Sequence, residues 1–219
     1  MKLKIEYCAD LGIAWGALNL YSLLEALAKL PEIEAELDIR PVELQPDLPP
    51  EGMEAREYFS QTYGADMVLV TQTREAMRDW ARELNFDFRP DLRTRIYNGF
   101  DSLRLLRWAL VQPGAQVQKV QQKLALAFVN LTYVQGGNTS DPAQLLHCVE
   151  ELGLDVKWAR QVLQSNAFAD EVRDLEAEFR DQGVDMLPAL YVNGKLVSQG
   201  SQTPQTFMTI LRVAAGLAA

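Results

Sequence analysis

The chain has few of the side chains from which most catalytic and metal sites are built. Its 219 residues include two cysteines, Cys8 and Cys148, and a single histidine, His147. Two cysteines that stand 140 positions apart have neither the spacing of a metal site nor that of a redox pair. One histidine leaves little choice of geometry for a Ser-His or Cys-His pair. The inventory therefore excludes most familiar catalytic constellations and predicts no metal site.

Long apolar runs and positive charge are also scarce. No run approaches the roughly 18 apolar residues of a membrane span, and the first residues lack the apolar region and cleavage site of a signal peptide. These features predict a cytoplasmic protein that has no membrane partner. The formal net charge is −9 and no cluster of Lys or Arg is longer than two residues, which argues against nucleic acid as a partner.

The composition is that of an ordinary globular protein. Hydrophobic residues make up 48% of the chain and charged residues 23%. A chain of this length is expected to bury roughly 70% of its unfolded surface, as one large domain or a domain with an insertion.

The first 53 residues have the pattern of a βαβ unit. Leu3, Ile5 and Tyr7 alternate with charged residues, so a strand is predicted over residues 2–7. A helix with a broad apolar face is predicted over residues 15–30, where Pro31 ends it. A second strand is predicted over residues 35–44, and the proline-rich residues 45–53 lead out of the unit.

The middle of the chain is predicted to be helical, with no strand pair between residues 54 and 181. Gly64 interrupts the first helical segment, and a short apolar piece at 67–70 precedes a helix over 74–84. Further helices are predicted over residues 102–110 and 115–133, from Ser140-Asp-Pro142 to Gly153, and over 155–181. The acidic residues 170–181 are predicted to form a solvated face.

The last segment returns to strands. Residues 189–192 and 195–198 flank Asn193-Gly194, the strongest short signal for a hairpin, and a final helix is predicted over 204–217. A βαβ unit, a helical block and a ββα unit are typical of an α/β thioredoxin fold with a large insertion. The predicted domains are residues 1–53 with 182–219, and a helical insertion over 54–181.

Residues 8–20 and 185–195 resemble the active-site face of the DsbA-like thioredoxin family, and more closely its FrnE-type branch of thiol–disulfide oxidoreductases. In that branch the first strand ends in Ser-Asp, two residues follow, and Cys-Pro-Trp-Cys opens a helix. Here Asp10 keeps the Asp, and Ile13-Ala-Trp-Gly16 stands at the Cys-x-x-Cys. Further along, Asn98, Arg104 and Leu105 match the Asn-Thr-x-x-Ala-His-Arg-Leu of the branch.

The resemblance implies a protein that keeps the fold of the family but lacks the two thiols that carry out disulfide exchange. Thiol–disulfide exchange needs a thiolate and normally a second thiol to resolve the mixed disulfide. Ile13 and Gly16 supply neither, and Ile13 also excludes the serine that kappa-class glutathione transferases and hydroxychromene-carboxylate isomerases carry there. Trp15 survives, either as a platform for a ligand or as a residue that caps the core.

Leu187-Pro188 resembles the cis-proline that faces the active-site cysteines in this fold. The resemblance implies a cis bond and an unpaired backbone edge at Leu187, with which an extended peptide or glutathione can pair as an added strand. The other interpretation is a plain structural turn. The expected ligand groove therefore consists of Ile13, Trp15, Gly16, Leu187 and Pro188, and glutathione is a candidate ligand rather than a cofactor.

Several side chains leave alternatives open. Cys8 is either a buried, inert thiol or a weak candidate for a single-thiol catalyst, and Cys148 is expected to be inert. His147 is expected at a helix surface or in the core. Arg104, Arg107 and Trp108 either bind an anionic ligand or pack against the thioredoxin domain.

The leading hypothesis is a non-redox protein of this family that binds an extended peptide or a small thiol in the groove, with no catalytic residue. The rivals are an active exchange catalyst that uses Cys8, and a glutathione-dependent isomerase or transferase.

Overall fold

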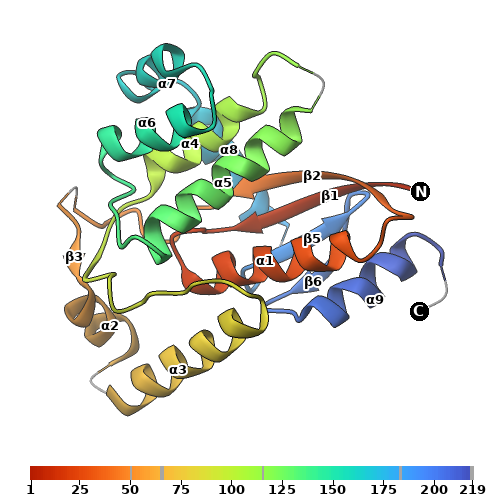
Figure 1. Cartoon of the computed structure of the whole chain (residues 1–219), viewed down its shortest axis with the longest axis horizontal. Helices are drawn as coiled ribbons and strands as arrows, with labels where there is room; N and C mark the ends of the chain where they lie inside the picture. The colour runs from red at the N-terminus through yellow and green to blue at the C-terminus, as the bar shows by residue number, and fades with distance from the viewer. Residues whose placement is uncertain (50, 65–66, 115, 183, 218–219) are drawn as a thin grey trace.

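A four-stranded sheet joins the two ends of the chain (Figure 1). The computed structural model describes residues 1–49, 51–64, 67–114, 116–182 and 184–217. The sheet has the order β2-β1-β5-β6, with β1 parallel to β2, and with β5 antiparallel to β1 and β6. Its strands are β1 (Lys2–Ala9), β2 (Glu34–Pro41), β5 (Ala189–Val192) and β6 (Lys195–Gln199). The thioredoxin-like α/β architecture predicted from the sequence is confirmed.

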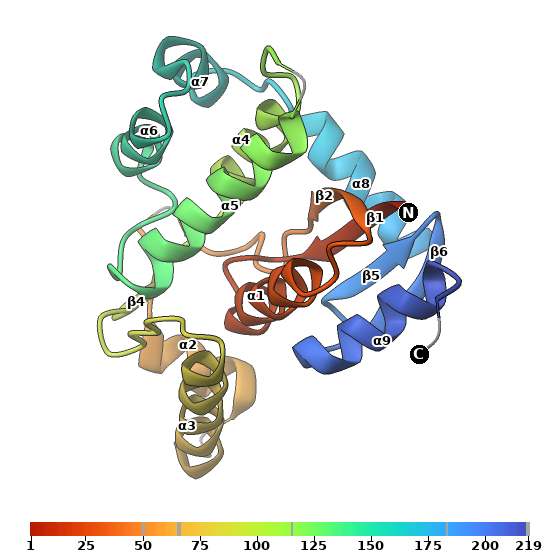
Figure 2. The same cartoon turned by 45° about the vertical axis from the view of Figure 1, so that its right-hand side comes forward.

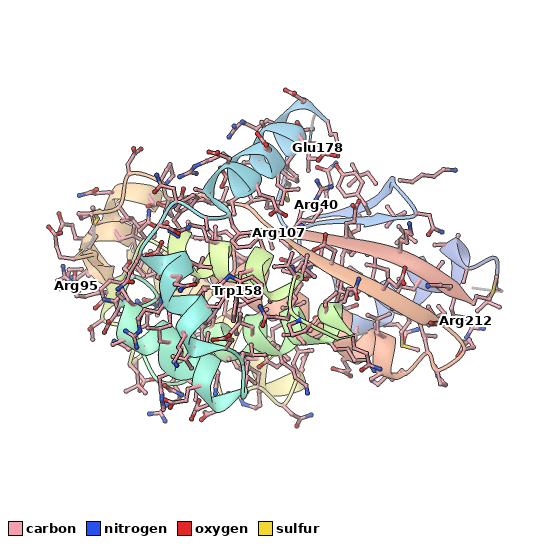
Figure 3. All side chains as sticks on the ribbon, turned by 90° about the horizontal axis from the view of Figure 1, so that it is seen from above. Arg40, Arg95, Arg107, Trp158, Glu178 and Arg212 are labelled. Atoms are coloured by element: carbon pink, nitrogen blue, oxygen red, sulfur yellow. The ribbon has the colours of Figure 1, made fainter. Side chains whose placement is uncertain are left out.

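Helices cover both faces of this sheet. Helices α1 (Ala14–Ala28) and α9 (Pro204–Ala214) lie side by side on one face, and α8 (Ala169–Asp181) lies on the other (Figures 1 and 3). The alternation along β1 sends Leu3, Ile5 and Tyr7 into the main core beneath α1. Cys8 points to the opposite face, where it packs near Phe179 of α8.

Apart from α8, the helices between β2 and β5 form two groups (Figure 2). The first comprises α2 (Ala55–Tyr63) and α3 (Met67–Glu83), and α3 packs beside α1. The second comprises α4 (Phe100–Ala109), α5 (Val117–Tyr133), α6 (Pro142–Glu151) and α7 (Val156–Leu163). The predicted start of α6 is confirmed, because Asp141 caps it by accepting a hydrogen bond from the Ala143 amide and Pro142 is its first residue.

Three expectations for this region were wrong. Residues 53–54 and 95–96 form a short antiparallel pair, β3 (Met53–Glu54) with β4 (Arg95–Ile96), although no strand pair was expected. Two residues per strand are too few for a periodic pattern to show. Residues 67–70 are the first turn of α3, because Val70, Met77 and Ala81 share its buried face. Residues 155–181 contain two helices, with the left-handed Phe168 before the second.

One hydrophobic core runs through the sheet and the helical region. It contains buried residues from β1, α1, α3, α4, α5, α6, α7 and α9. Trp108 of α4 is fully buried in this core and meets Trp158 of α7 edge-on, with ring centroids 5.7 Å apart. The division into residues 1–53 with 182–219 and an insertion over 54–181 stays a prediction. Among the helices that the structure describes, none has the length and apolar character that a membrane span requires.

Candidate functional site

The turn between β1 and α1 is held by a buried carboxylate. Asp10 Oδ1 accepts a hydrogen bond from the Gly12 amide at 2.7 Å, and its Oδ2 accepts one from the Leu44 amide at 2.9 Å. Burial raises the pKa of Asp10 to about 6, although both hydrogen bonds and the positive charge of Arg93 act to lower it. Asp10 therefore fixes the start of α1 against the residues that follow β2.

Ile13 and Gly16, the two positions that the sequence resemblance sets against the thiols of the family, differ in the space around them. Gly16 is buried, and its carbonyl accepts a hydrogen bond from Tyr7 Oη at 2.6 Å. A Cβ at Gly16 would overlap the carbonyl oxygen of Asp10. Ile13, the residue that precedes α1, lines an open cavity instead. The second position of the motif therefore has no room for a side chain, whereas the first has.

A cavity of about 280 Å³ lies at the start of α1. Most of its wall is apolar or aromatic and comes from Ile13 and Trp15, from Phe59 of α2, from Met77 of α3 and from Phe88 in the following loop. Trp15 is half-buried and packs against Trp80 of α3, with ring centroids 5.9 Å apart. The first group of helices thus forms the wall of the cavity opposite α1.

Two arginines in the wall of the cavity supply its positive charge. The guanidinium carbon of Arg74 lies 5.0 Å from the centroid of the Phe59 ring, and that of Arg93 lies 4.9 Å from the centroid of Tyr133. Arg93 also donates hydrogen bonds to the carbonyl of Gly12 at 2.7 Å and to Tyr133 Oη at 3.3 Å. Burial lowers the pKa of Arg74, as do the charges of Arg78 and Arg93. Both arginines are therefore held on aromatic faces of one cavity.

Leu187 and Pro188 lie at the same end of the sheet as this turn, because Ala189 pairs with Cys8 near the end of β1. The Leu187-Pro188 bond is cis. Among the described residues, no hydrogen bond involves the backbone N–H or C=O of Leu187, whereas the Pro188 carbonyl accepts one from Gly200. Of the five predicted groove residues, Ile13 and Trp15 line the cavity, and Gly16, Leu187 and Pro188 are not part of its described wall.

Neither cysteine lies at this cavity. Cys8 is 2% exposed on the α8 face of the sheet, and burial raises the pKa of its thiol to about 12. Cys148 is buried on α6, and burial raises its pKa to about 11. Both are free thiols. At neutral pH both groups are protonated, and a protonated thiol is a poor nucleophile.

The polar residues of α4 and α8 join elements together. Arg104 is buried and donates to the carbonyl of Val162 in α7 and to those of Ser165 and Ala167 after it. Arg107 pairs with Asp38 of β2 at 2.9 Å and with Glu171 of α8 at 2.8 Å, between α8 and the sheet (Figure 3). Arg107 therefore follows the packing interpretation, because Asp38 belongs to the sheet. Arg104 joins helices of the middle region to one another, and Trp108 is buried in the main core.

Two further expectations concern the acidic residues and the histidine. The acidic face of α8 is mostly exposed, but Glu176 is buried and accepts a hydrogen bond from the Glu43 amide at 2.8 Å. The prediction of a solvated face was therefore wrong at Glu176. His147 is exposed on α6, 3.5 Å from Glu151. Within the described residues, no group of three or more His, Cys, Asp or Glu side chains is arranged to hold a metal ion.

Sequence reasoning missed Arg74, Arg93 and Tyr133. The apolar residues of α3 indicate which face of the helix is buried, and Arg74 lies beside that face. The sequence prediction began the helix at residue 74 instead of 67, so the position of Arg74 on it was not recognised. Arg93 lies in a loop, where no periodicity points to a neighbour.

Comparison with known proteins gives a consistent family. A family model described as a DsbA-like thioredoxin domain matches residues 19–212. A probable DsbA oxidoreductase from Streptomyces coelicolor has a TM-score of 0.83 at 22% identity, over 99% of this chain and 92% of that one. A putative protein disulfide isomerase from Nitrosomonas europaea has a TM-score of 0.70 at 16% identity, over 99% and 98%.

A third similar structure is the cytosolic disulfide reductase DsbM from Pseudomonas aeruginosa, with a TM-score of 0.63 at 16% identity over 98% of this chain and 100% of that one. DsbM is also known in a structure with GSH. At these identities the likeness shows a shared fold. No curated protein sequence matches the chain.

Proposed function

This chain belongs to the family of DsbA-like thioredoxin domains, and from that premise we propose that it binds a small, largely apolar ligand at the start of α1 without exchanging disulfides. The observation that carries the proposal is the cavity of about 280 Å³ at Ile13 and Trp15, next to the turn that resembles the active-site motif of the family. This volume is near the lower end of ligand cavities, which span about 300–1,000 Å³. Placement in the FrnE-type branch is part of the proposal.

The chemistry of the site supports a role without redox turnover. A hydrocarbon at Ile13 cannot attack a disulfide, and the contact between Gly16 and Asp10 leaves no space for a resolving thiol. The two thiols that the chain does have are buried elsewhere with raised pKa values. Ligand binding needs only the cavity and its wall, both of which are present.

A native thiol titration with a coloured disulfide reagent tests the proposal. Cys8 and Cys148 are expected to react slowly or not at all in native buffer at pH 7, and fully in denaturant, because both are buried and protonated. The protein is also expected to show no turnover in an insulin-reduction assay. Insulin reduction at an enzyme-like rate that Cys8→Ser abolishes would overturn the proposal in favour of a Cys8 catalyst.

Glutathione or an extended peptide at Leu187 is the second candidate. The cis Leu187-Pro188 bond and the backbone groups of Leu187, which make no hydrogen bond among the described residues, support it. Thermal unfolding with millimolar glutathione distinguishes this second candidate from the apolar-ligand proposal. A rise in unfolding temperature favours a glutathione-dependent isomerase or transferase, whereas no shift together with unreactive thiols counts against both enzymatic alternatives.

A further inference from the structure

We infer that the ligand of this cavity is an amphipathic carboxylate, with its apolar part against Ile13 and Trp15 and its charged group between Arg74 and Arg93. The inference rests on the proposed function, since it names the ligand class of the same site. It depends on the arrangement of two cations from separate segments around one apolar space.

The two guanidinium groups approach the cavity from different elements. Arg74 belongs to α3, and Arg93 to the loop before β4. Each lies over an aromatic ring that also lines the cavity, Phe59 for Arg74 and Tyr133 for Arg93. Such stacking fixes the plane of a guanidinium group and hence the direction of its N–H donors. The cavity therefore has two charged groups whose orientation is set before a ligand enters.

Neither arginine forms an ion pair among the described residues, although Asp10 acts electrostatically on Arg93 and Glu54 on Arg74. Within the described part of the chain, no Asp or Glu oxygen lies within 4.0 Å of Arg74 or Arg93. The arginines between the sheet, α4 and α8 differ, since Arg40, Arg107 and Arg173 each pair with two carboxylates. A guanidinium group stays charged in a protein, and holding it half-buried beside apolar surface without a directly paired carboxylate is unfavourable. A ligand carboxylate would offset this cost and the mutual repulsion of the pair.

The donors needed for such a carboxylate are present. Arg93 uses two of its N–H groups, on Gly12 and Tyr133, and a guanidinium group has five. Arg74 makes no hydrogen bond among the described residues. Planar forks of this kind match the two oxygens of a carboxylate. The rest of the wall is mainly hydrocarbon or aromatic, which selects a ligand with an apolar body.

Matched eight-carbon probes test the inference. Sodium octanoate, 1-octanol and octylamine are titrated into the full chain, and binding is followed by tryptophan fluorescence, since Trp15 lines the cavity, and by calorimetry. We expect octanoate to bind at least tenfold more tightly than 1-octanol, and octylamine to bind most weakly of the three. Equal binding of octanoate and 1-octanol would overturn the inference and leave the proposed function standing. No binding of any probe at millimolar concentration would overturn both.

Arginine variants locate the charge. Arg74→Met is expected to weaken octanoate binding tenfold or more while it changes 1-octanol binding less than twofold, because it removes a charge and keeps the apolar stem. Arg82→Met, at an exposed position of the same helix, is the control and is expected to change neither affinity. Arg93→Met is the second variant, with its fold checked by circular dichroism because Arg93 also holds Gly12. Unchanged octanoate affinity in Arg74→Met would contradict the inference.

Discussion

Asp10 stabilises the turn before α1 through two hydrogen bonds, but its burial makes the charged carboxylate unfavourable. Its carboxylate holds two backbone amides, yet burial raises its pKa to about 6 from an ordinary value of about 3.9. The folded state therefore binds the proton more tightly than the unfolded state. By linkage, this contribution to stability is fully present below about pH 4 and is lost as the pH rises through 6. Each pKa unit corresponds to about 1.4 kcal/mol, so the loss is about 3 kcal/mol at most.

Asp10→Asn is expected to remove this pH dependence. An amide does not titrate, so the free energy of unfolding should fall less between pH 4.5 and 7.5 in the variant than in the wild type. Urea unfolding at the two pH values measures the free energy of unfolding at each. The test is the change in this free energy between the two pH values rather than its absolute size, because Asn also loses one acceptor oxygen. Asp47→Asn, at an exposed position, is the control. Equal changes in the wild type and Asp10→Asn would refute the prediction.

Gly16 has no room for a side chain, so a thiol cannot be placed at this position by substitution alone. Any Cβ there overlaps the Asp10 carbonyl, which is backbone and cannot rotate away. Gly16→Ala is therefore expected to lower the free energy of unfolding by about 1–3 kcal/mol, as overpacking usually does. Ile13→Ala is the matched comparison, because Ile13 borders a cavity, and it should cost less. Urea unfolding measures the stability of the two variants. A Gly16→Ala protein as stable as the wild type would contradict the prediction, because it would mean that the start of α1 can move away from the Asp10 carbonyl at no cost.

Secondary-structure elements with a repeated apolar pattern were predictable, and those held by tertiary contacts were not. The alternation of Leu3, Ile5 and Tyr7 located β1, and Asn193-Gly194 located the turn between β5 and β6. The pair β3 and β4 has no such pattern, and the Arg95 guanidinium holds it through the carbonyls of Glu51 and Gly52 (Figure 3). A bond between segments more than forty positions apart leaves no trace in local sequence.

The candidate site divides in the same way. The motif containing Ile13 and Trp15 was recognisable because its spacing is local to the β1–α1 turn. The cations were not, because Arg74 and Arg93 reach the cavity only when α3 and its following loop fold against α1. Arg104 was recognised as a motif residue, but its three carbonyl partners lie about sixty positions away, so its structural role could not be inferred.

At the scale of the whole molecule, two kinds of contact connect the helical region to the sheet: the shared hydrophobic core and buried polar contacts. Gln121 of α5 is fully buried and pairs with the backbone of Ile39 in β2. Its Oε1 accepts from the Ile39 amide at 2.8 Å, and its Nε2 donates to the Ile39 carbonyl at 2.9 Å. At Ile39 the outer edge of β2 is therefore paired with a helix side chain rather than with a further strand.

The sheet and the insertion are consequently expected to unfold as one unit. Gln121→Leu leaves two buried backbone groups of Ile39 unpaired and should cost roughly 2–6 kcal/mol, at about 1–3 kcal/mol for each group. Native-state hydrogen exchange should show the most protected amides of β1 and of α5 opening with the same free energy in the wild type, and both falling together in Gln121→Leu. Lys119→Leu, at an exposed position on α5, should change neither. If Gln121→Leu lowers protection in α5 while β1 keeps its wild-type value, the insertion is an independently stable domain, and the single core does not make the molecule cooperative.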